Sequence, residues 1–174
     1  MDMDTFDPDG LTELPFGMPG KIYRSPMPFH PGDEYGGLLD QFRLTGIQAV
    51  VLLMPRPEYL QKAGRDLAEL YRHAGMKIVD MPVQDFTIPE PVSMDKALDE
   101  TLALARSGKN IVVHCYAGFG RTGTFMACMA VRLLNKTGRE AIEWVRQFVP
   151  PALENEAQIR FVSEYGERYA DYKR

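Results

Sequence analysis

The chain has 174 residues, of which 45% are hydrophobic and 25% are charged, and its formal net charge is −4 at pH 7. This composition is typical of a soluble globular protein that is long enough for one buried core. The acidic balance argues against a protein that coats nucleic acid or rests on an anionic membrane. Only two cysteines are present, Cys115 and Cys128, which argues against a disulfide framework and favours a reducing, cytoplasmic compartment.

The N-terminal stretch MDMDTFDPDG is acidic and has no apolar core, so no secretory signal is predicted. No apolar run approaches the ~20 residues of a membrane span. Two cysteines and three scattered histidines argue against a structural zinc site. Residues 1–20, rich in Pro, Gly and Asp, predict an irregular lead-in, and residues 21–174 predict a single domain without repeats or linkers.

The first half of that domain alternates between strand and helix patterns. Apolar, partly β-branched runs predict strands, and apolar positions at helical spacing predict helices. The predicted elements are a strand at Lys21–Ser25, a helix at Asp33–Thr45, a buried strand at Ile47–Met54, a helix at Glu58–Ala74 and a strand at Lys77–Val83.

The second half continues the alternation. The predicted elements are a helix capped by Ser93 and running to Arg106, a strand at Asn110–His114, an apolar helix at Thr122–Asn135, a helix opened by a capping box at Thr137–Glu140 and stopped before Pro150, and a last helix at Asn155–Tyr172. Strands that alternate with helices predict an α/β fold with a mainly parallel central sheet flanked by helices.

A glycine-bearing loop, CYAGFGR, joins the strand at Asn110–His114 to the apolar helix. Ligands of such sheets bind beyond the carboxyl ends of the strands. Gly118 and Gly120 permit a tight curl in which successive N–H groups point inward and form an anion nest. The helix that follows adds the positive end of its dipole, and Arg121 can offer a bidentate fork. The loop therefore predicts a site for a phosphate-like group.

Cys115 stands at the mouth of this loop. A thiol beside a helix N-terminus and a cation is expected to ionise at neutral pH, and a thiolate under a bound phosphate is a nucleophile aimed at phosphorus. An inert buried cysteine is the alternative, which the surrounding loop argues against. Cys128 lies in the apolar helix and is expected to pack in the core, with a redox partnership with Cys115 as the alternative.

The stretch HCYAGFGRTG, His114 to Gly123, resembles the signature of cysteine-dependent protein tyrosine phosphatases, in which five residues separate the cysteine from the arginine. The chain is short and has no evident phosphotyrosine-gripping loop upstream. In both respects it resembles the dual-specificity branch, and its kinase-associated and atypical members above all. The resemblance covers most of Lys21–Tyr172. It implies a protein tyrosine phosphatase-like fold and hydrolysis of phosphoric monoesters through a phosphocysteine intermediate, without metal or cofactor.

The resemblance also implies roles for particular residues. The phosphate loop would consist of Tyr116, Ala117, Gly118, Phe119, Gly120 and Arg121, supported by His114. Thr122 would stabilise the thiolate when the intermediate breaks down. Gln158 would orient the hydrolytic water, with Asn155 as the alternative for that role.

The general acid of the family lies in a loop before the helix that precedes the signature. Asp85, in DFTIP, has the proline four residues further on that the family shows. An aspartic acid there protonates the leaving oxygen and then serves as base for water. Asp80 is the rival, although it lies within a predicted strand. Arg24 and Arg56 follow strand-like runs and are candidates for the rim of the pocket, with an ordinary surface position as the alternative.

The expected activity is hydrolysis of phosphotyrosine in a protein substrate, with phosphoserine and phosphothreonine as further candidates. A phosphoinositide, inositol phosphate or RNA 5′-triphosphate remains an alternative substrate, although the five residues between Cys115 and Arg121 carry no cation. A non-catalytic phospho-binding module and a rhodanese-type sulfurtransferase are alternatives of other classes. No nucleic-acid or membrane partner is expected, and the oligomeric state is left open.

Overall fold

The computed structural model describes residues 6–174, and the strands within them form one sheet in the order β1-β2-β5-β3-β4. Its strands are β1 (Thr12–Leu14), β2 (Ile22–Ser25), β3 (Ile47–Leu52), β4 (Lys77–Asp80) and β5 (Asn110–His114). Strands β2, β5, β3 and β4 run parallel, and β1 pairs antiparallel with β2 at one edge. The prediction of an α/β fold with a mainly parallel sheet is therefore confirmed.

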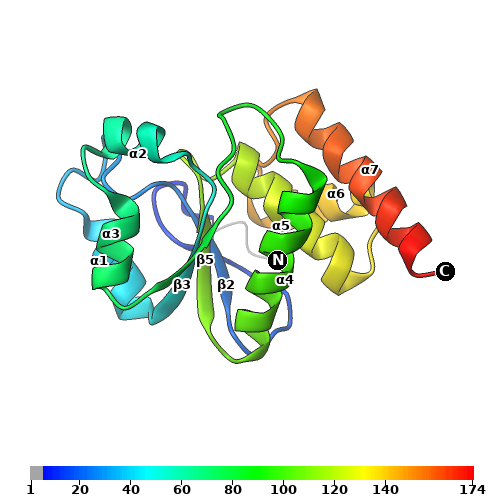
Figure 1. Cartoon of the computed structure of the whole chain (residues 1–174), viewed down its shortest axis with the longest axis horizontal. Helices are drawn as coiled ribbons and strands as arrows, with labels where there is room; N and C mark the ends of the chain where they lie inside the picture. The colour runs from blue at the N-terminus through cyan, green and yellow to red at the C-terminus, as the bar shows by residue number, and fades with distance from the viewer. Residues whose placement is uncertain (1–5) are drawn as a thin grey trace.

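Helices cover both faces of this sheet. They are α1 (Gly37–Thr45), α2 (Arg56–Ala63), α3 (Leu67–His73), α4 (Pro91–Arg106), α5 (Gly120–Leu134), α6 (Gly138–Phe148) and α7 (Glu156–Tyr172). Helices α1 to α3 lie on one side of the sheet and α4 to α7 on the other (Figure 1). Because both faces are covered, β3 and β5 are buried on both sides, which explains their nearly unbroken runs of Val and Ile.

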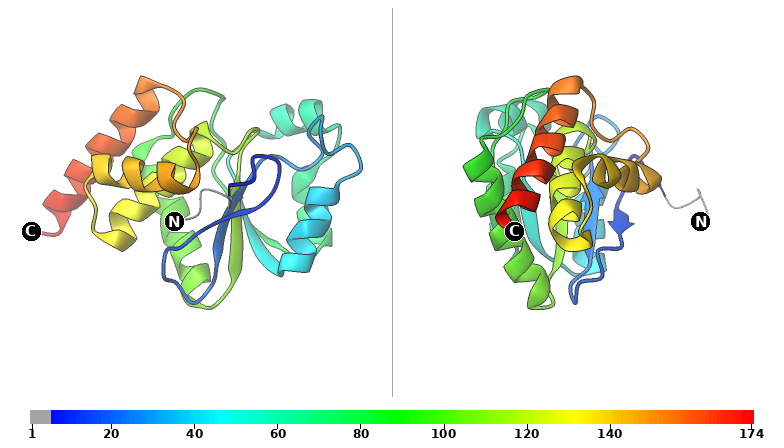
Figure 2. Two further views of the ribbon diagram at one scale, coloured as in Figure 1. Left: turned by 180° about the vertical axis from the view of Figure 1, so that it is seen from behind. Right: turned by 90° about the vertical axis from the view of Figure 1, so that its right-hand side faces the viewer.

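Helix α5 is the centre of the larger helical layer. Every residue from Gly120 to Val131 is buried, as the apolar pattern predicts. Helices α6 and α7 pack against α5 and against each other, and Figure 2 shows this group from behind and from the side. The predicted capping box is confirmed: Thr137 accepts from the Glu140 amide, and the Glu140 carboxylate accepts from the Thr137 amide.

The single helix predicted at Glu58–Ala74 is wrong. Two helices, α2 and α3, occupy this segment. Gly64 adopts φ 64° and ends α2, and the side chain of Asp66 caps α3 by accepting from the Glu69 amide. The apolar spacing continues across the break, so it did not reveal the change of direction.

Other boundaries also differ from the predictions. Strand β1 lies in the segment predicted as irregular, where three residues at a sheet edge give too short a pattern to detect, and residues 1–5 of that segment lie outside the described part. Ser93 does not cap α4, because Pro91, which needs no amide partner, already occupies the first turn. Helix α1 begins at Gly37 rather than at Asp33, and α5 begins at Gly120, inside the predicted loop.

Candidate active site

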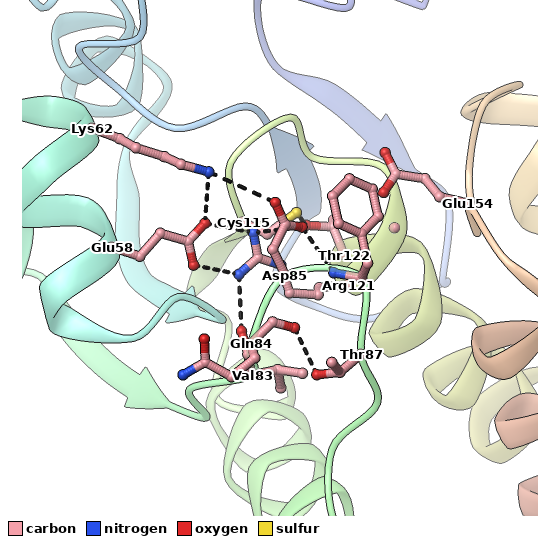
Figure 3. A network of polar contacts seen from close by, with 12 residues as sticks. Glu58, Lys62, Val83, Gln84, Asp85, Thr87, Cys115, Arg121, Thr122 and Glu154 are labelled. Carbon is pink, nitrogen blue, oxygen red and sulfur yellow. Dashed lines mark hydrogen bonds and ion pairs between the residues drawn. The ribbon is translucent and has the colours of Figure 1, made fainter.

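The carboxyl ends of the four parallel strands bring together residues that are far apart in the sequence. Cys115 follows β5, Arg24 lies near the end of β2, Glu58 lies in the helix after β3, and Asp85 lies in the loop after β4. Parallel strands place such ends at one edge of the sheet. The edge therefore carries a sulfur, two carboxylates and the Arg24 guanidinium. Arg121 lies beside the same sulfur and carboxylates (Figure 3).

The loop Tyr116–Gly120 turns its carbonyl groups outward. The Met27 amide donates to the Tyr116 carbonyl (2.8 Å), and the Leu153 amide donates to the Phe119 carbonyl (3.1 Å). The guanidinium of Arg24 donates to the two carbonyls between them, those of Ala117 and Gly118.

The amide groups on the opposite side of this loop, from Tyr116 to Arg121, donate to no other residue in the described part of the chain. These free donors lie at the start of α5, where the helix dipole favours negative charge. The loop thus has the form of an anion nest.

Cys115 lies beneath this nest and is only 3% exposed. The hydroxyl of Thr122 donates to its sulfur at 3.1 Å. The preceding residue, His114, holds the start of the loop: its Nδ1 lies 2.9 Å from the Cys115 carbonyl, and its Nε2 lies 2.7 Å from the Tyr71 hydroxyl. A carbonyl only accepts, so Nδ1 carries the proton and Nε2 accepts from Tyr71.

His114 is neutral in this position. Burial lowers its pKa to about 4, and the cations of Arg121 and Arg24 lower it further, against the effect of the hydrogen bond to the Cys115 carbonyl. The neutral imidazole therefore links Tyr71 to the start of the loop through two hydrogen bonds.

Arg121 is held from three sides. Its Nη1 and Nη2 donate to the two carboxylate oxygens of Glu58 at 2.7 and 2.9 Å, its Nη1 also donates to the Val83 carbonyl at 2.9 Å, and Asp85 lies 3.2 Å from Nη2. Burial lowers the pKa of Arg121, but its hydrogen bond to Glu58 and the charges of Cys115, Glu58 and Asp85 outweigh this effect and raise the pKa. Its Nε is buried and has no partner in the described residues, which leaves one N–H for a ligand.

Asp85 lies in a turn stabilised by its neighbours. The Phe86 amide donates to Asp85 Oδ1 at 3.0 Å, and Thr87 donates to the Gln84 carbonyl through both its amide and its hydroxyl. The Asn155 side chain donates to the Phe86 carbonyl at 2.9 Å and ties this turn to the start of α7. The turn thus holds the Asp85 carboxylate against Arg121.

Asp80, the rival for the acid, lies at the end of β4 and is exposed. It lines one surface hollow with Arg56 and Arg72 and another with Gln84 and Thr87, but within the described residues it forms no ion pair with Arg121, unlike Asp85. Arg56 pairs with Asp66 at 3.0 Å on the surface, which is the ordinary position that the sequence left open for it.

Gln158 and Asn155 differ in whether their side-chain amides have a hydrogen-bonding group without a partner. Asn155 uses its carbonyl to cap α7 and its amide to bind Phe86. Gln158 is fully buried, and its carbonyl accepts from the Glu154 amide at 2.8 Å, but its Nε2 has no partner in the described residues. A Cβ atom added to Gly120 would lie 3.0 Å from that Nε2, so the free amide faces the phosphate loop.

Three residues near the site were not predicted from the sequence, namely Glu58, Lys62 and Glu154. Lys62 lies 3.1 Å from Glu58 and 3.7 Å from Asp85, and its ammonium sits 4.0 Å from the centroid of the Tyr116 ring. Glu58 and Lys62 form an i, i+4 pair that the sequence shows, but only the packing reveals which way α2 faces. Glu154 approaches Gly120 from α7's side, and burial together with the Asp85 charge raises its pKa.

Arg24 departs from its expected position. The sequence predicted a position at the rim of the pocket or on the surface. Both predictions are wrong, because the side chain is completely buried behind the phosphate loop. Within residues 6–174, no group of three or more His, Cys, Asp or Glu side chains could hold a metal ion, and no helix is long and apolar enough to cross a membrane.

The fold and this cluster define the class of cysteine-based phosphatases. Residues 33–135, more than half of the chain, match the family model described as "Polymorphic toxin system, DSP-PTPase phosphatase". The chain therefore belongs to the dual-specificity, protein tyrosine phosphatase-like family.

Curated relatives agree with this assignment. Protein tyrosine phosphatase domain-containing protein 1 of Danio rerio is 28% identical over 145 residues, which are 77% of this chain but 20% of that protein. Cyclin-dependent kinase inhibitor 3 of Rattus norvegicus is 24% identical over 76% of this chain and 64% of its own length. An uncharacterised protein of Methanocaldococcus jannaschii is 33% identical over 79% of this chain and 75% of its own length. The chain thus spans about a fifth of the Danio protein.

Solved structures share the fold. Kinase associated phosphatase, with its catalytic cysteine replaced by serine, has a TM-score of 0.82 at 18% identity, over 94% of this chain and 97% of that chain. Tk-PTP in the active form has a TM-score of 0.73 at 28% identity, over 86% of this chain and 93% of that chain. PTPMT1 in complex with PI(5)P has a TM-score of 0.75 at 16% identity, over 88% and 94%.

Proposed function

We propose that this protein hydrolyses phosphate monoesters of phosphorylated proteins, with phosphotyrosine as the main substrate and phosphoserine and phosphothreonine as further substrates. The observation that carries the proposal is the arrangement around Cys115: outward carbonyls are all bound, inward amides are free, and Arg121 keeps one unpartnered N–H. A tetrahedral dianion is the ligand that such a nest and guanidinium suit.

The first step transfers the phosphoryl group to sulfur. The amides from Tyr116 to Arg121 and the Arg121 guanidinium bind the phosphate oxygens, and the dianion takes the place of Asp85 beside Arg121. The Cys115 thiolate attacks phosphorus, the bond between phosphorus and the ester oxygen breaks, and the Asp85 carboxylic acid gives its proton to that oxygen. The backbone dipoles of the loop and the Arg121 guanidinium stabilise the negative charge that develops in the transition state.

The second step releases phosphate. A water molecule attacks phosphorus, Asp85 accepts its proton, and the bond between sulfur and phosphorus breaks. The Thr122 hydroxyl, 3.1 Å from the sulfur, donates to the departing thiolate. Gln158 supplies the water-orienting amide, because its Nε2 is free while both ends of the Asn155 amide are engaged.

The electrostatics of the mouth favour a phosphoprotein over a polyanionic substrate. Lys62 is the cation that α2 adds beside the loop, but Glu58 and Asp85 already pair with it. Glu154 adds a further carboxylate near Gly120. A phosphoinositide remains the second candidate, since PTPMT1 in complex with PI(5)P shares the fold. Both cysteines are free, which supports the cytoplasmic compartment in this proposal.

Hydrolysis of p-nitrophenyl phosphate by wild type, Cys115→Ser and Cys128→Ser tests the proposal. We expect Cys115→Ser to lose all turnover and Cys128→Ser, whose thiol is buried in α5, to keep it. Activity that survives in Cys115→Ser would refute the mechanism, and a wild type inactive on every phosphate ester would favour a binding module. Phosphotyrosine and phosphothreonine peptides, compared with phosphoinositides and RNA 5′-triphosphate ends, then decide the substrate class.

A further inference from the structure

Arg24 is a completely buried arginine at the sheet edge that carries the site. A buried cation requires partners that replace water. Within residues 6–174 no carboxylate forms an ion pair with it, and backbone carbonyls surround it instead. The rings of Phe6 and Phe119 lie 5.5 and 5.2 Å from its guanidinium carbon and complete the enclosure. This arrangement stabilises the charge without neutralising it.

The carbonyls come from two separate parts of the chain. On one side, Nη2 donates to the Ala117 carbonyl at 2.8 Å and Nε donates to the Gly118 carbonyl at 3.2 Å. On the other side, Nη1 donates to the Asp7 carbonyl at 2.8 Å and lies 3.4 Å from the Gly10 carbonyl. The guanidinium therefore connects the phosphate loop to the N-terminal segment Phe6–Gly10.

The two loop contacts determine where the anion-binding amides point. A trans peptide group carries its C=O and its N–H on opposite sides. When Arg24 holds the Ala117 and Gly118 carbonyls outward, the amides of Gly118 and Phe119 point inward. Gly118 has φ 77°, and a Cβ there would lie 2.3 Å from the Ser25 carbonyl oxygen, so the loop can adopt this path only with glycine at that position.

Arg24 also places a positive charge beside the phosphate loop, where it contacts the Ala117 and Gly118 carbonyls. Burial lowers its pKa to about 10, while the negative charges of Cys115, Asp7 and Asp9 act in the opposite direction. The guanidinium thus remains charged at neutral pH.

We propose that Arg24 is a positioning residue that sets the two central peptide groups of the phosphate loop for anion binding and couples the loop to the N-terminal segment Phe6–Gly10. This inference rests on the proposed function, because the oriented amides are those that would bind the phosphoryl group. It extends that function to a segment outside the signature stretch.

The test uses tungstate as the oxyanion probe and compares Arg24→Met with Arg24→Lys. We expect Arg24→Met to weaken tungstate binding by roughly tenfold or more and to raise KM for p-nitrophenyl phosphate. Arg24→Lys keeps the charge but lacks the planar fork that reaches the loop carbonyls and the N-terminal segment at once. It should restore little of the tungstate affinity.

Arg132→Met is the matched control. Arg132 is also largely buried and bonded to Asp95, Asp99 and Tyr165, but it lies eleven residues along α5 from Arg121, about 16 Å by helical rise. Its loss should reduce the free energy of unfolding and leave tungstate affinity and KM for p-nitrophenyl phosphate unchanged.

Three outcomes decide between the proposals. Wild type that binds tungstate, with a folded Arg24→Met variant of equal affinity and equal KM, overturns the role of Arg24 and leaves the proposed function intact. Wild type that neither binds tungstate nor hydrolyses p-nitrophenyl phosphate overturns the proposed function, and the role of Arg24 with it. If Arg24→Met fails to fold, Phe6→Ala opens the enclosure instead, and an unchanged tungstate affinity there counts against the coupling.

Discussion

Both carboxylate oxygens of Glu58 accept hydrogen bonds from the Arg121 guanidinium, at 2.7 and 2.9 Å. Arg121 follows β5 and Glu58 follows β3, so the contact joins the phosphate loop to a helix of the opposite layer. Burial raises the pKa of Glu58, but Arg121 and Lys62 outweigh it, and the net pKa is lowered. Glu58 is thus an ionised brace that fixes the plane of the arginine.

Removing this brace is expected to impair substrate binding. Glu58→Gln should lower kcat/KM for p-nitrophenyl phosphate by about 10- to 100-fold, mainly through KM, because a charged hydrogen bond to a buried arginine contributes about 1.5–3 kcal/mol. Steady-state kinetics measure the effect. Arg56→Gln, on the same helix but in an exposed pair with Asp66, should change it little. An unchanged KM in Glu58→Gln would show that Arg121 keeps its position without Glu58.

Substitutions of Asp85 and Asp80 are expected to have very different effects on kcat. Asp85→Asn should lower kcat by about 10²- to 10⁴-fold for phosphate esters with poor leaving groups, and less for p-nitrophenyl phosphate, whose leaving group needs little protonation. Asp80→Asn should leave kcat within about twofold, because Arg121 pairs with Asp85 and not with Asp80. A series of aryl phosphates with leaving groups of increasing pKa measures this dependence, and the reverse order of effects would exchange the two roles.

Gln158 is expected to act only on the second step. Gln158→Ala should slow breakdown of the phosphocysteine by about tenfold while the first step keeps its rate, since the Nε2 that faces Gly120 would be lost. Rapid-quench kinetics would then show a burst of p-nitrophenol and a trapped intermediate. Gln147→Ala, an exposed glutamine of α6, serves as control. If both steps slow equally in Gln158→Ala, the residue only supports the fold of α7.

The buried neutral His114 should make stability depend on pH. Its pKa is lowered from 6.5 to about 4, so the unfolded chain binds a proton before the folded protein does as the pH falls. This group should cost on the order of 3 kcal/mol of unfolding free energy between pH 6.5 and pH 4, and nothing above that window.

Urea denaturation at pH 7 and at pH 4 measures this loss. His114→Asn should lack that part of the pH dependence, although it is less stable at pH 7 because the bond with Tyr71 is lost. His73→Asn, at an exposed position of α3, should keep the full dependence. Equal pH slopes in wild type and His114→Asn would place the titrating group elsewhere.

Several features could be predicted from the sequence, because they depend on contacts between residues that are close together in the chain. Strand β5 and the capping box at Thr137 and Glu140 follow from residues that interact with near neighbours, and both are confirmed. The order of cysteine, glycines and arginine likewise indicated the family, because a phosphate loop is built from consecutive residues. The break at Gly64 was missed, since the apolar spacing of α2 and α3 continues across it.

The sequence by itself determined the α/β class, the phosphate loop and the family, because periodicity and short-range spacing carry that information. Only the tertiary structure decided that Glu58 braces Arg121, that Asp85 rather than Asp80 faces it, and that Arg24 lies buried behind the loop. These contacts join residues from 36 to more than 90 positions apart. They depend on the strand order of the sheet, and strand order is fixed by how whole faces pack together rather than by any one segment.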